Sequence, residues 1–212
     1  LRSFNKSMPE EINRIMCDHA STLLFSPTPT GYHNLLHEGF KDLEKGPFNA
    51  DRPKIYHCGD VMYDNSLYFS KLAKKKSGIL KKHGLDSGPF LLGTIHRDNN
   101  TDVTDRLKAI FEALLEIAKD VKVVLPLHPR THKKMQELLS KDLLKDIQAC
   151  DELLIIPPVS FLDMVLLEES SQMIITDSGG VQKESYFFQK PCLILRPETE
   201  WIEIVEAGAA RI

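Results

Sequence analysis

The second part of the chain alternates short apolar runs with amphipathic stretches, a pattern typical of strands and helices that follow one another. The apolar runs are hydrophobic along their whole length, as in strands that are covered on both faces. The strands are expected at residues 90–96, 121–128, 153–159, 173–177 and 192–196. The helices are expected at residues 102–119, 132–144, 161–170, 181–189 and 201–207. This succession predicts a doubly wound α/β domain built on a parallel sheet.

The first 85 residues repeat the same pattern in a shorter form. A helix is expected at residues 9–20, because Pro9 suits the first helical position and the two acids after it suit the helix dipole. A strand at 23–26, a helix at 32–40 and a strand at 54–57 are expected to follow. Two strands with their helices make a poor core, so we expect this segment to be the end of a first domain whose opening half is absent.

Residues 60–82 are expected to form a helical linker, and the turn-rich segment 85–89 is expected to be a domain boundary. The predicted domains are therefore 1–85 and 86–212. The chain begins at Leu1 and stops at Ile212 directly after an apolar helix, so we expect a fragment of a longer enzyme.

Composition favours a globular protein without a membrane or nucleic-acid partner. Charged residues make up 27% of the 212 residues, and the net charge is only -3. No apolar run reaches the roughly 18 residues that a membrane span requires. The four cysteines lie far apart without a C-x-x-C spacing, which predicts reduced thiols of a cytoplasmic protein and no structural zinc site.

The strongest chemical signal is an apolar strand that stops at Ser178-Gly179-Gly180 and turns into a helix. Backbone N–H groups at a helix start are unpaired and carry the positive end of the dipole, and glycines let an anion approach them closely. Glu184 follows one helical turn later, where it could accept hydrogen bonds from the ribose of a nucleotide. A tight strand-to-helix turn without a ligand explains these residues equally well.

Two strand ends each carry an imidazole beside a guanidinium. His96 and Arg97 form the first pair, and His128 and Arg130 form the second. Such a pair suits an anion site or an acid/base site. A surface loop and a buried strand end followed by a solvated arginine are the alternatives.

Ligands of doubly wound sheets bind beyond the carboxyl ends of the strands. Four of the candidate residues stand at the carboxyl ends of expected strands and should line one rim: His96, His128, Ser178 and Arg196. In the first helix, Glu10 and Arg14 are spaced i, i+4 and are expected to face the same way. They fit either an exposed ion pair or a catalytic carboxylate held by an arginine.

These motifs occur in a fixed order along the chain: Leu1-Arg2, residues 9–14, Phe25-Ser26-Pro27-Thr28, Thr94-Ile95-His96-Arg97, residues 176–184, Lys190-Pro191 and residues 196–201. Together they resemble the non-hydrolysing UDP-N-acetylglucosamine 2-epimerases, over essentially the whole chain.

The resemblance implies two Rossmann-like domains of the glycosyltransferase-B type, the first one incomplete in this chain, with a UDP-sugar in the cleft between them. It implies an isomerase that eliminates UDP across C1 and C2, passes through 2-acetamidoglucal and adds UDP back with inversion at C2. UDP-N-acetylglucosamine and UDP-N-acetylmannosamine would be interconverted for cell-surface polysaccharides, in a cytoplasmic homodimer that uses no organic cofactor or metal.

The resemblance also assigns roles to residues of this sequence. The catalytic roles fall on His96 and Glu10. The nucleotide-binding roles fall on Ser178, Gly179 and Gly180 for the pyrophosphate, Glu184 for the ribose, and Phe161 or Met164 for the uracil. Possible substrate or effector contacts are Arg97, His128, Arg14 and Arg196, of which Arg97 and His128 match in type the residues that bind a second UDP-N-acetylglucosamine as activator.

Two positions depart from the pattern of many members. Asn99 stands where a glutamate is common, and Trp201 stands where many bacterial members have an arginine. The Thr94-Ile95-His96-Arg97 and Thr199-Glu200-Trp201 forms resemble a branch of the family that includes enzymes acting on other UDP-2-acetamido sugars, uronic acids among them. The family's other acidic catalytic residues and its first glycine-rich loop are expected before Leu1, so the activity of the fragment alone stays open. A hydrolysing epimerase, a glycosyltransferase of the same fold and a nucleotide-binding module stay open as alternatives.

Overall fold

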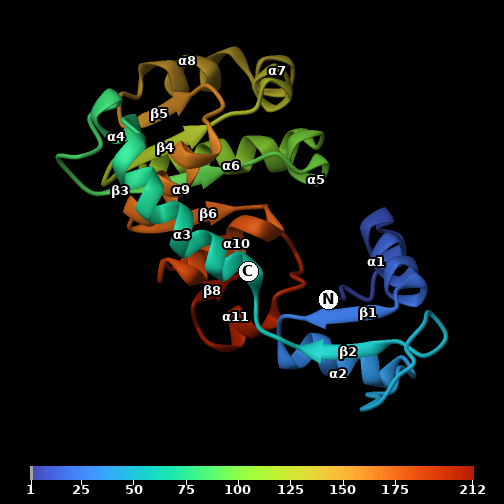
Figure 1. The fold of residues 1–212 in the computed structure, drawn as a ribbon. Helices are drawn as coiled ribbons and strands as arrows, with labels where there is room; N and C mark the ends of the chain where they lie inside the picture. Colours follow the sequence, from blue (N-terminus) through green and yellow to red (C-terminus); the bar gives the residue numbers. More distant parts are fainter. Residues whose placement is uncertain (1) are drawn as a thin grey trace.

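The computed structural model describes residues 2–212, so Leu1 of the first motif lies outside the described residues. The chain forms two parallel sheets, which Figure 1 shows in two parts of unequal size. The smaller sheet pairs β1 (Leu23–Ser26) with β2 (Lys54–His57). The larger sheet has the order β5-β4-β3-β6-β7-β8. The predicted α/β architecture with parallel sheets is confirmed.

The strands of the larger sheet are β3 (Phe90–Thr94), β4 (Lys122–Pro126), β5 (Leu153–Ile156), β6 (Met173–Thr176), β7 (Cys192–Ile194) and β8 (Ala210–Arg211). The chain builds outward from β3 to β5 and then returns to place β6 on the other side of β3. The strand order therefore reverses between β3 and β6, and such a switch point opens a crevice at the carboxyl ends of the two strands. This crevice is where the structure gathers its candidate site.

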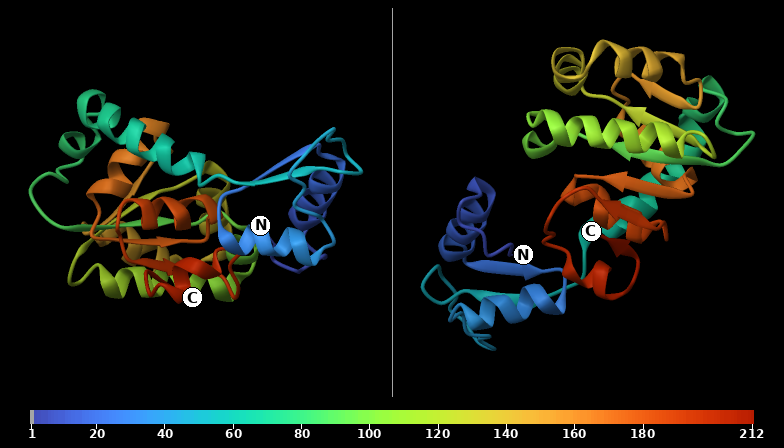
Figure 2. Two further views of the ribbon diagram at one scale, coloured as in Figure 1. Left: turned by 60° about the horizontal axis from the view of Figure 1, so that its bottom comes forward. Right: turned by 180° about the vertical axis from the view of Figure 1, so that it is seen from behind.

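Helices cover both faces of the larger sheet, as Figure 2 shows in two further views. One layer contains α6 (Thr104–Ile117), α7 (Pro129–Leu138) and α8 (Lys141–Ala149). The other contains α3 (Val61–Lys76), α4 (Ile79–Lys82), α9 (Phe161–Ser170) and α10 (Gly179–Phe187). Successive strand residues alternate between the two cores: Leu91, Val123 and Leu125 pack into the first, whereas Leu92 and Val124 pack into the second. Burial on both sides explains why these strands are apolar throughout.

Helix α3 begins just after β2, and Figure 1 shows it extending from the smaller sheet along the larger one. Its residue Ala73, with Ile79 of α4 and Leu85 of the following turn, packs in the same core as Phe90 and Leu92 of β3. Helices α3 and α4 therefore pack against the larger sheet. The division of the chain at residue 85 stays a prediction.

The smaller part contains α1 (Pro9–Ala20) and α2 (Pro29–His37) beside β1 and β2. Its core is small and is formed by Leu24, Leu35 and Ile55. Charge pairs add to it, because the buried Arg2 side chain lies 2.7 Å from Asp18 and 2.6 Å from Glu38. These contacts hold α1 and α2 together at the beginning of the described chain.

Several predicted element boundaries were wrong, and local capping explains them. The single helix expected at 132–144 is two helices, because Ser140 accepts a hydrogen bond from the Leu143 N–H and starts α8. The helix expected at 32–40 starts earlier, because Thr28 caps it and Pro29 occupies its first turn.

Three further boundaries differ from the prediction. The expected linker 60–82 is interrupted at Ser77, whose N–H bonds to the Ala73 carbonyl at the end of α3. A short α5 (Asp98–Thr101) precedes α6, and α11 (Ile202–Glu206) is followed by β8, which the sequence pattern did not predict. A two-residue strand is too short to produce a visible alternation. Within residues 2–212, none of the helices is long and apolar enough to cross a membrane.

Candidate functional site

The corner between β6 and α10 is the start of a helix. Ser178 is the N-cap of α10, and its Oγ accepts a hydrogen bond from the Val181 N–H at 3.5 Å. The Ser178 N–H in turn donates to Thr176 Oγ1 at 2.9 Å, which fixes the turn. A Cβ placed on Gly180 would lie 3.9 Å from Ser178 Oγ and 4.0 Å from Glu184 Oε2. The Glu184 carboxylate therefore reaches back along α10 to the level of Gly180.

Asp177 ties this corner to the end of β3. Its buried carboxylate accepts hydrogen bonds from the backbone N–H groups of His96 at 3.1 Å and Arg97 at 3.0 Å, and from the Asn100 side-chain amide at 3.0 Å. Asn100 also donates to the Leu195 carbonyl after β7 at 2.8 Å. Sequence reasoning missed Asp177 and Asn100. A carboxylate that directly follows a buried strand needs partners, and that requirement was the available signal.

His96 extends from this hub toward solvent. Its imidazole Nδ1 lies 3.3 Å from Asp177 Oδ1, while its side chain is 49% exposed. The ring is thus oriented by a fixed carboxylate and keeps an accessible face, which suits an acid/base group or a cation beside an anion. Thr94 Oγ1 and Thr176 Oγ1 are 2.5 Å apart and join the last residues of β3 and β6.

Arg196 and Glu200 lie on the other side of the corner. Arg196 donates to Glu200 through both terminal nitrogens, at 2.9 and 3.2 Å. A Cβ placed on Gly179 would lie 3.8 Å from Glu200 Oε2 and 3.9 Å from Arg196 Nη1. The predicted contact residue Arg196 is therefore beside the corner, but a buried carboxylate already holds it.

Trp201 also contacts the corner. Its indole N–H donates to the Gly179 carbonyl at 2.9 Å. Lys183 lies over the indole ring at 4.2 Å from its centroid and pairs with Asp60 at 2.5 Å. The position that departs from the pattern of many bacterial members thus supports the turn through its ring and its N–H.

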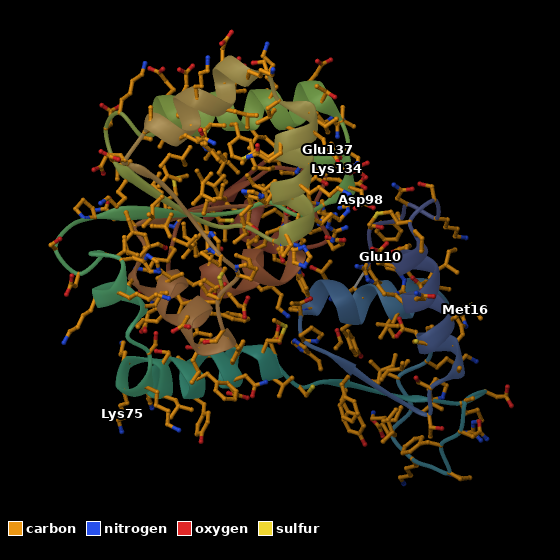
Figure 3. All side chains as sticks on the ribbon, turned by 90° about the horizontal axis from the view of Figure 1, so that it is seen from above. Glu10, Met16, Lys75, Asp98, Lys134 and Glu137 are labelled. Carbon is orange, nitrogen blue, oxygen red and sulfur yellow. The ribbon has the colours of Figure 1, made fainter. Side chains whose placement is uncertain are left out.

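The predicted pairing of Glu10 with Arg14 was wrong. Arg14 lies 3.1 Å from Glu11 and 3.3 Å from Glu200, at spacing i, i+3 and across to the larger sheet. Residues three and four positions apart are both neighbours on a helix surface, so the spacing allowed either acid, and the buried Glu11 is the one that Arg14 contacts. Figure 3 shows Glu10 instead on the side of α1 that faces the larger part, and it is exposed.

Glu11, Arg14, Glu200 and Arg196 form a continuous chain of ion pairs, which we call the clasp. Burial acts to raise the pKa of Glu11, but hydrogen bonds from the Ser3 and Phe4 N–H groups and from Arg14 outweigh it and lower that pKa. Burial likewise opposes ionisation of Glu200, yet Arg196 and Arg14 lower its pKa. Both carboxylates are therefore charged at neutral pH.

Glu184 lies near a second acid, Glu168 of α9. Burial raises the pKa of Glu184, and burial together with the Glu184 charge raises that of Glu168 well above its ordinary value. Glu168 Oε2 has no hydrogen-bond partner among residues 2–212. We call these two residues the acid pair.

The candidates for uracil contacts begin α9. Phe161 is 55% exposed and its ring meets Phe69 of α3 edge to face at 5.1 Å. Met164 is partly buried against the core below β3. Helix α9 starts after β5 and therefore opens at the same carboxyl edge as the corner.

The second imidazole–guanidinium pair has local structural partners. His128 caps α7, and its Nδ1 accepts from the Arg130 N–H at 3.2 Å. The Arg130 guanidinium lies 2.8 Å from Asp98 and 2.7 Å from Asp102. His128 keeps an exposed side chain at the rim, whereas Arg130 ties α5 to α7.

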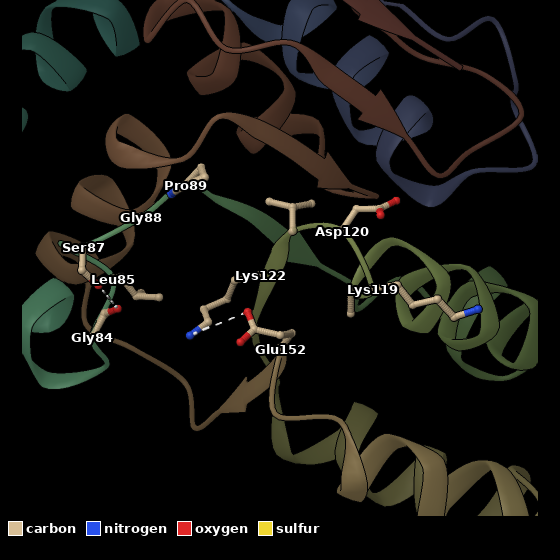
Figure 4. A pocket seen from close by; sticks show the side chains of 11 residues that line it. Gly84, Leu85, Ser87, Gly88, Pro89, Lys119, Asp120, Lys122 and Glu152 are labelled. Carbon is tan, nitrogen blue, oxygen red and sulfur yellow. Dashed lines mark hydrogen bonds and ion pairs between the residues drawn. The ribbon is translucent and has the colours of Figure 1, made fainter.

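A cavity of about 150 Å³ lies between the two parts, lined by Phe4, Thr28 and Gly31 on one side and by Thr199, Glu200 and Trp201 on the other. A separate cavity of about 360 Å³ lies where the strands begin, lined by Leu85, Lys122 and Glu152 (Figure 4). That edge is opposite to the corner. Among residues 2–212, no three His, Cys, Asp or Glu side chains are grouped to hold a metal ion.

Known proteins are similar to this chain in sequence and in fold. The family model described as UDP-N-acetylglucosamine 2-epimerase matches residues 1–212. A Pseudomonas aeruginosa protein named UDP-2,3-diacetamido-2,3-dideoxy-D-glucuronate 2-epimerase is 45% identical, over 99% of this chain and 53% of its own length. A UDP-N-acetylglucosamine 2-epimerase of Methanocaldococcus jannaschii is 39% identical, over 99% of this chain and 55% of its own length.

Solved structures agree with this relationship. The Methanocaldococcus jannaschii UDP-GlcNAc 2-epimerase in complex with UDP-GlcNAc and UDP has a TM-score of 0.83 at 37% identity, over 99% of this chain and 55% of that one. The fold is thus of the glycosyltransferase-B-like kind, and the chain spans about half the length of the relatives it matches. The chain belongs to the UDP-N-acetylglucosamine 2-epimerase family.

Proposed function

We propose that the full-length protein interconverts UDP-N-acetylglucosamine and UDP-N-acetylmannosamine by eliminating UDP and adding it back through 2-acetamidoglucal. The observation that carries this proposal is the helix start at Ser178, joined through Asp177 to His96 at the switch point of the sheet. A departing pyrophosphate needs backbone donors of this kind. The membership of the chain in the epimerase family supports the same conclusion.

The proposed reaction needs a base for the C2 proton, an acid for the opposite face and a cradle for UDP. Ser178, Gly179 and Gly180 would hold the pyrophosphate, with His96 next to it. Glu184 would accept hydrogen bonds from the ribose hydroxyls, and Phe161 or Met164 would flank the uracil. Glu10, which is exposed on the facing side of α1, would supply a catalytic carboxylate.

NMR of the full-length protein with UDP-N-acetylglucosamine in deuterated water tests this proposal. We expect the C2-epimeric nucleotide sugar to appear with deuterium at C2. Release of free N-acetylmannosamine and UDP would instead indicate a hydrolysing epimerase. A sugar that keeps its C2 proton, although UDP binds, would favour a glycosyltransferase or a nucleotide-binding module.

A second candidate is an epimerase that acts on a UDP-2-acetamido uronic acid. The relative named UDP-2,3-diacetamido-2,3-dideoxy-D-glucuronate 2-epimerase supports it, as do Asn99 and Trp201. Deuterium exchange measured with both nucleotide sugars in parallel would rank the two by kcat/KM.

We further propose a cytoplasmic homodimer that supplies precursors for cell-surface polysaccharides and uses no organic cofactor, nucleic acid or membrane partner. Arg97 and His128 at the rim are proposed contacts for a second nucleotide sugar. Light scattering of the full-length protein tests the dimer, and turnover as a function of UDP-N-acetylglucosamine concentration tests the effector contacts. A hyperbolic dependence that Arg97→Ala leaves unchanged would argue against an effector role.

A further inference from the structure

Glu200 lies between two arginines that come from different parts of the molecule. Arg14 belongs to α1 of the smaller part and lies 3.3 Å from Glu200 Oε1. Arg196 follows β7 of the larger sheet and lies 2.9 Å from Glu200 Oε2. The exposed fraction of the side chain is only 2% for Glu200 and 7% for Arg196. One buried carboxylate thus joins the two parts.

The end of the clasp on α1 is equally fixed. Glu11 has a side chain that is 1% exposed, and it accepts the backbone N–H groups of Ser3 and Phe4 at 3.0 Å each. A second polar contact runs parallel to the clasp, because the Asn5 amide donates to Glu198 at 3.3 Å. The segment after β7 is therefore attached to α1 through Arg14 and to the stretch before α1 through Asn5.

The clasp connects two functional elements. Helix α1 carries Glu10, the neighbour of Glu11, and Glu10 faces the larger part of the molecule (Figure 3). At the other end, Arg196 lies 3.9 Å from the position of a Cβ on Gly179. Any change in the position of Glu200 would therefore alter the distance between α1 and the corner.

We propose that Glu200 is a positioning residue that sets the distance between Glu10 on α1 and the anion-binding corner at Gly179. This inference rests on the proposed function, because it assigns the two connected elements to one reaction. Glu200 does not need to touch the sugar nucleotide. It acts through Arg14 and Arg196, and misplacement of a catalytic group by about 1 Å can cost on the order of 100-fold in rate.

The charges of the clasp predict that Glu200→Gln affects nucleotide affinity and turnover differently. Two carboxylates balance two guanidinium groups, so Glu200→Gln leaves one positive charge uncompensated. Because that charge lies beside the corner, the affinity for an anionic nucleotide is maintained or increased. Turnover falls, because α1 is no longer held at the correct distance.

The test compares kcat with the Kd for UDP in the full-length protein carrying Glu200→Gln. We expect kcat to fall about tenfold or more, with a Kd for UDP equal to or below that of the wild type. Arg14→Gln should lower kcat in the same way without increasing the affinity for UDP. Glu137→Gln, on the exposed face of α7 (Figure 3), is the matched control and should change neither value.

An unchanged kcat in Glu200→Gln, or a parallel loss of kcat and UDP affinity, would overturn the proposal.

Hydrogen exchange without any ligand provides a readout that is independent of the reaction. Backbone amides of α1 should exchange faster in Glu200→Gln and Arg14→Gln than in Glu137→Gln, and equal rates in all three would also overturn it. If the wild-type protein neither binds UDP nor epimerises a nucleotide sugar, the proposed function fails, while the exchange comparison still tests the clasp. If Glu200→Gln does not fold, Arg14→Gln carries both measurements.

Discussion

The clasp and the acid pair both bury carboxylates beside the corner, but they differ in the cations around them. Glu11 and Glu200 each contact an arginine within 3.3 Å. Glu168 has a carboxylate oxygen with no hydrogen-bond partner in the described chain, and its neighbour is another acid, Glu184. Burial opposes ionisation in all four residues, yet the pKa is lowered in the clasp and raised in the acid pair.

This comparison separates a structural use of buried charge from a functional one. A paired buried charge holds elements together, and it costs most when one partner is removed. Two acids that share a site make ionisation of both unfavourable, and such sites are frequent where ligands bind. Glu184, the less buried member of the acid pair, is the residue proposed to meet the ribose.

The largest effect should follow from breaking the clasp. Glu200→Ala leaves Arg14 and Arg196 without their shared carboxylate, and removal of one partner from a buried ion pair typically costs about 3 to 5 kcal/mol. Urea unfolding measures the free energy. Glu168→Gln is the matched variant in the acid pair and should not destabilise the fold. Equal losses of unfolding free energy in the two variants would contradict the difference between the clasp and the acid pair.

The turnover rate should distinguish Glu10 from its neighbour Glu11 on α1. Glu10 is exposed and makes no contribution to the clasp, so Glu10→Gln should keep the stability of the wild type and lose about 100-fold or more in turnover. His96→Ala should lose rate to a similar extent. Turnover of the nucleotide sugar by the full-length protein is the measurement, and near-normal turnover in either variant would remove that residue from catalysis.

A smaller effect is expected on nucleotide binding in the acid pair. Glu184→Ala removes the proposed acceptor for the ribose hydroxyls, so the Kd for UDP should rise by about tenfold, as expected for hydrogen bonds to a charged group. The change in kcat should be smaller than the change in Kd. Calorimetry with UDP checks this, and an unchanged affinity would place the ribose elsewhere.

The smallest effect concerns the pH dependence of stability. The pKa of Glu168 is raised on folding, so the folded state holds its proton more tightly and stability falls as pH rises above the ordinary value of 4.5. Glu168→Gln removes this penalty and should stabilise the protein by on the order of 1 kcal/mol at neutral pH, with no gain below about pH 4.

The contribution of the clasp to stability changes with pH in the opposite direction. The lowered pKa values of Glu11 and Glu200 add stability above pH 4.5, which is lost as pH falls through the folded-state values. Unfolding curves of the wild type and Glu168→Gln across this range measure both trends. If Glu168→Gln gave the same gain at acidic and neutral pH, the raised pKa would not be its cause.

The sequence predicted most of the strands of the larger sheet, because strands that are buried on both faces are uniformly apolar. It predicted the Ser178 corner and placed His96, His128 and Arg196 at strand ends, since strand ends are marked by the change from apolar to polar residues. Helix breaks such as Ser140 and Ser77 were missed, because a serine within a polar stretch also occurs on the exposed face of an uninterrupted helix.

The contacts of the site required the tertiary structure. Asp177 receives hydrogen bonds from residues 96, 97 and 100, which are about 80 positions away in the sequence. Arg14 pairs with Glu11 and Glu200 instead of Glu10, and no spacing rule relates position 14 to position 200.

The sequence by itself determined the parallel α/β sheets, the helix start that suits an anion, and the family. Those properties depend on local hydrophobicity, on backbone conformation and on motifs that lie within a few residues of one another. Only the tertiary structure decided which carboxylates are paired with cations and which are left beside another acid. Charge pairing depends on distance in space and on burial, and both are set when separate elements pack together.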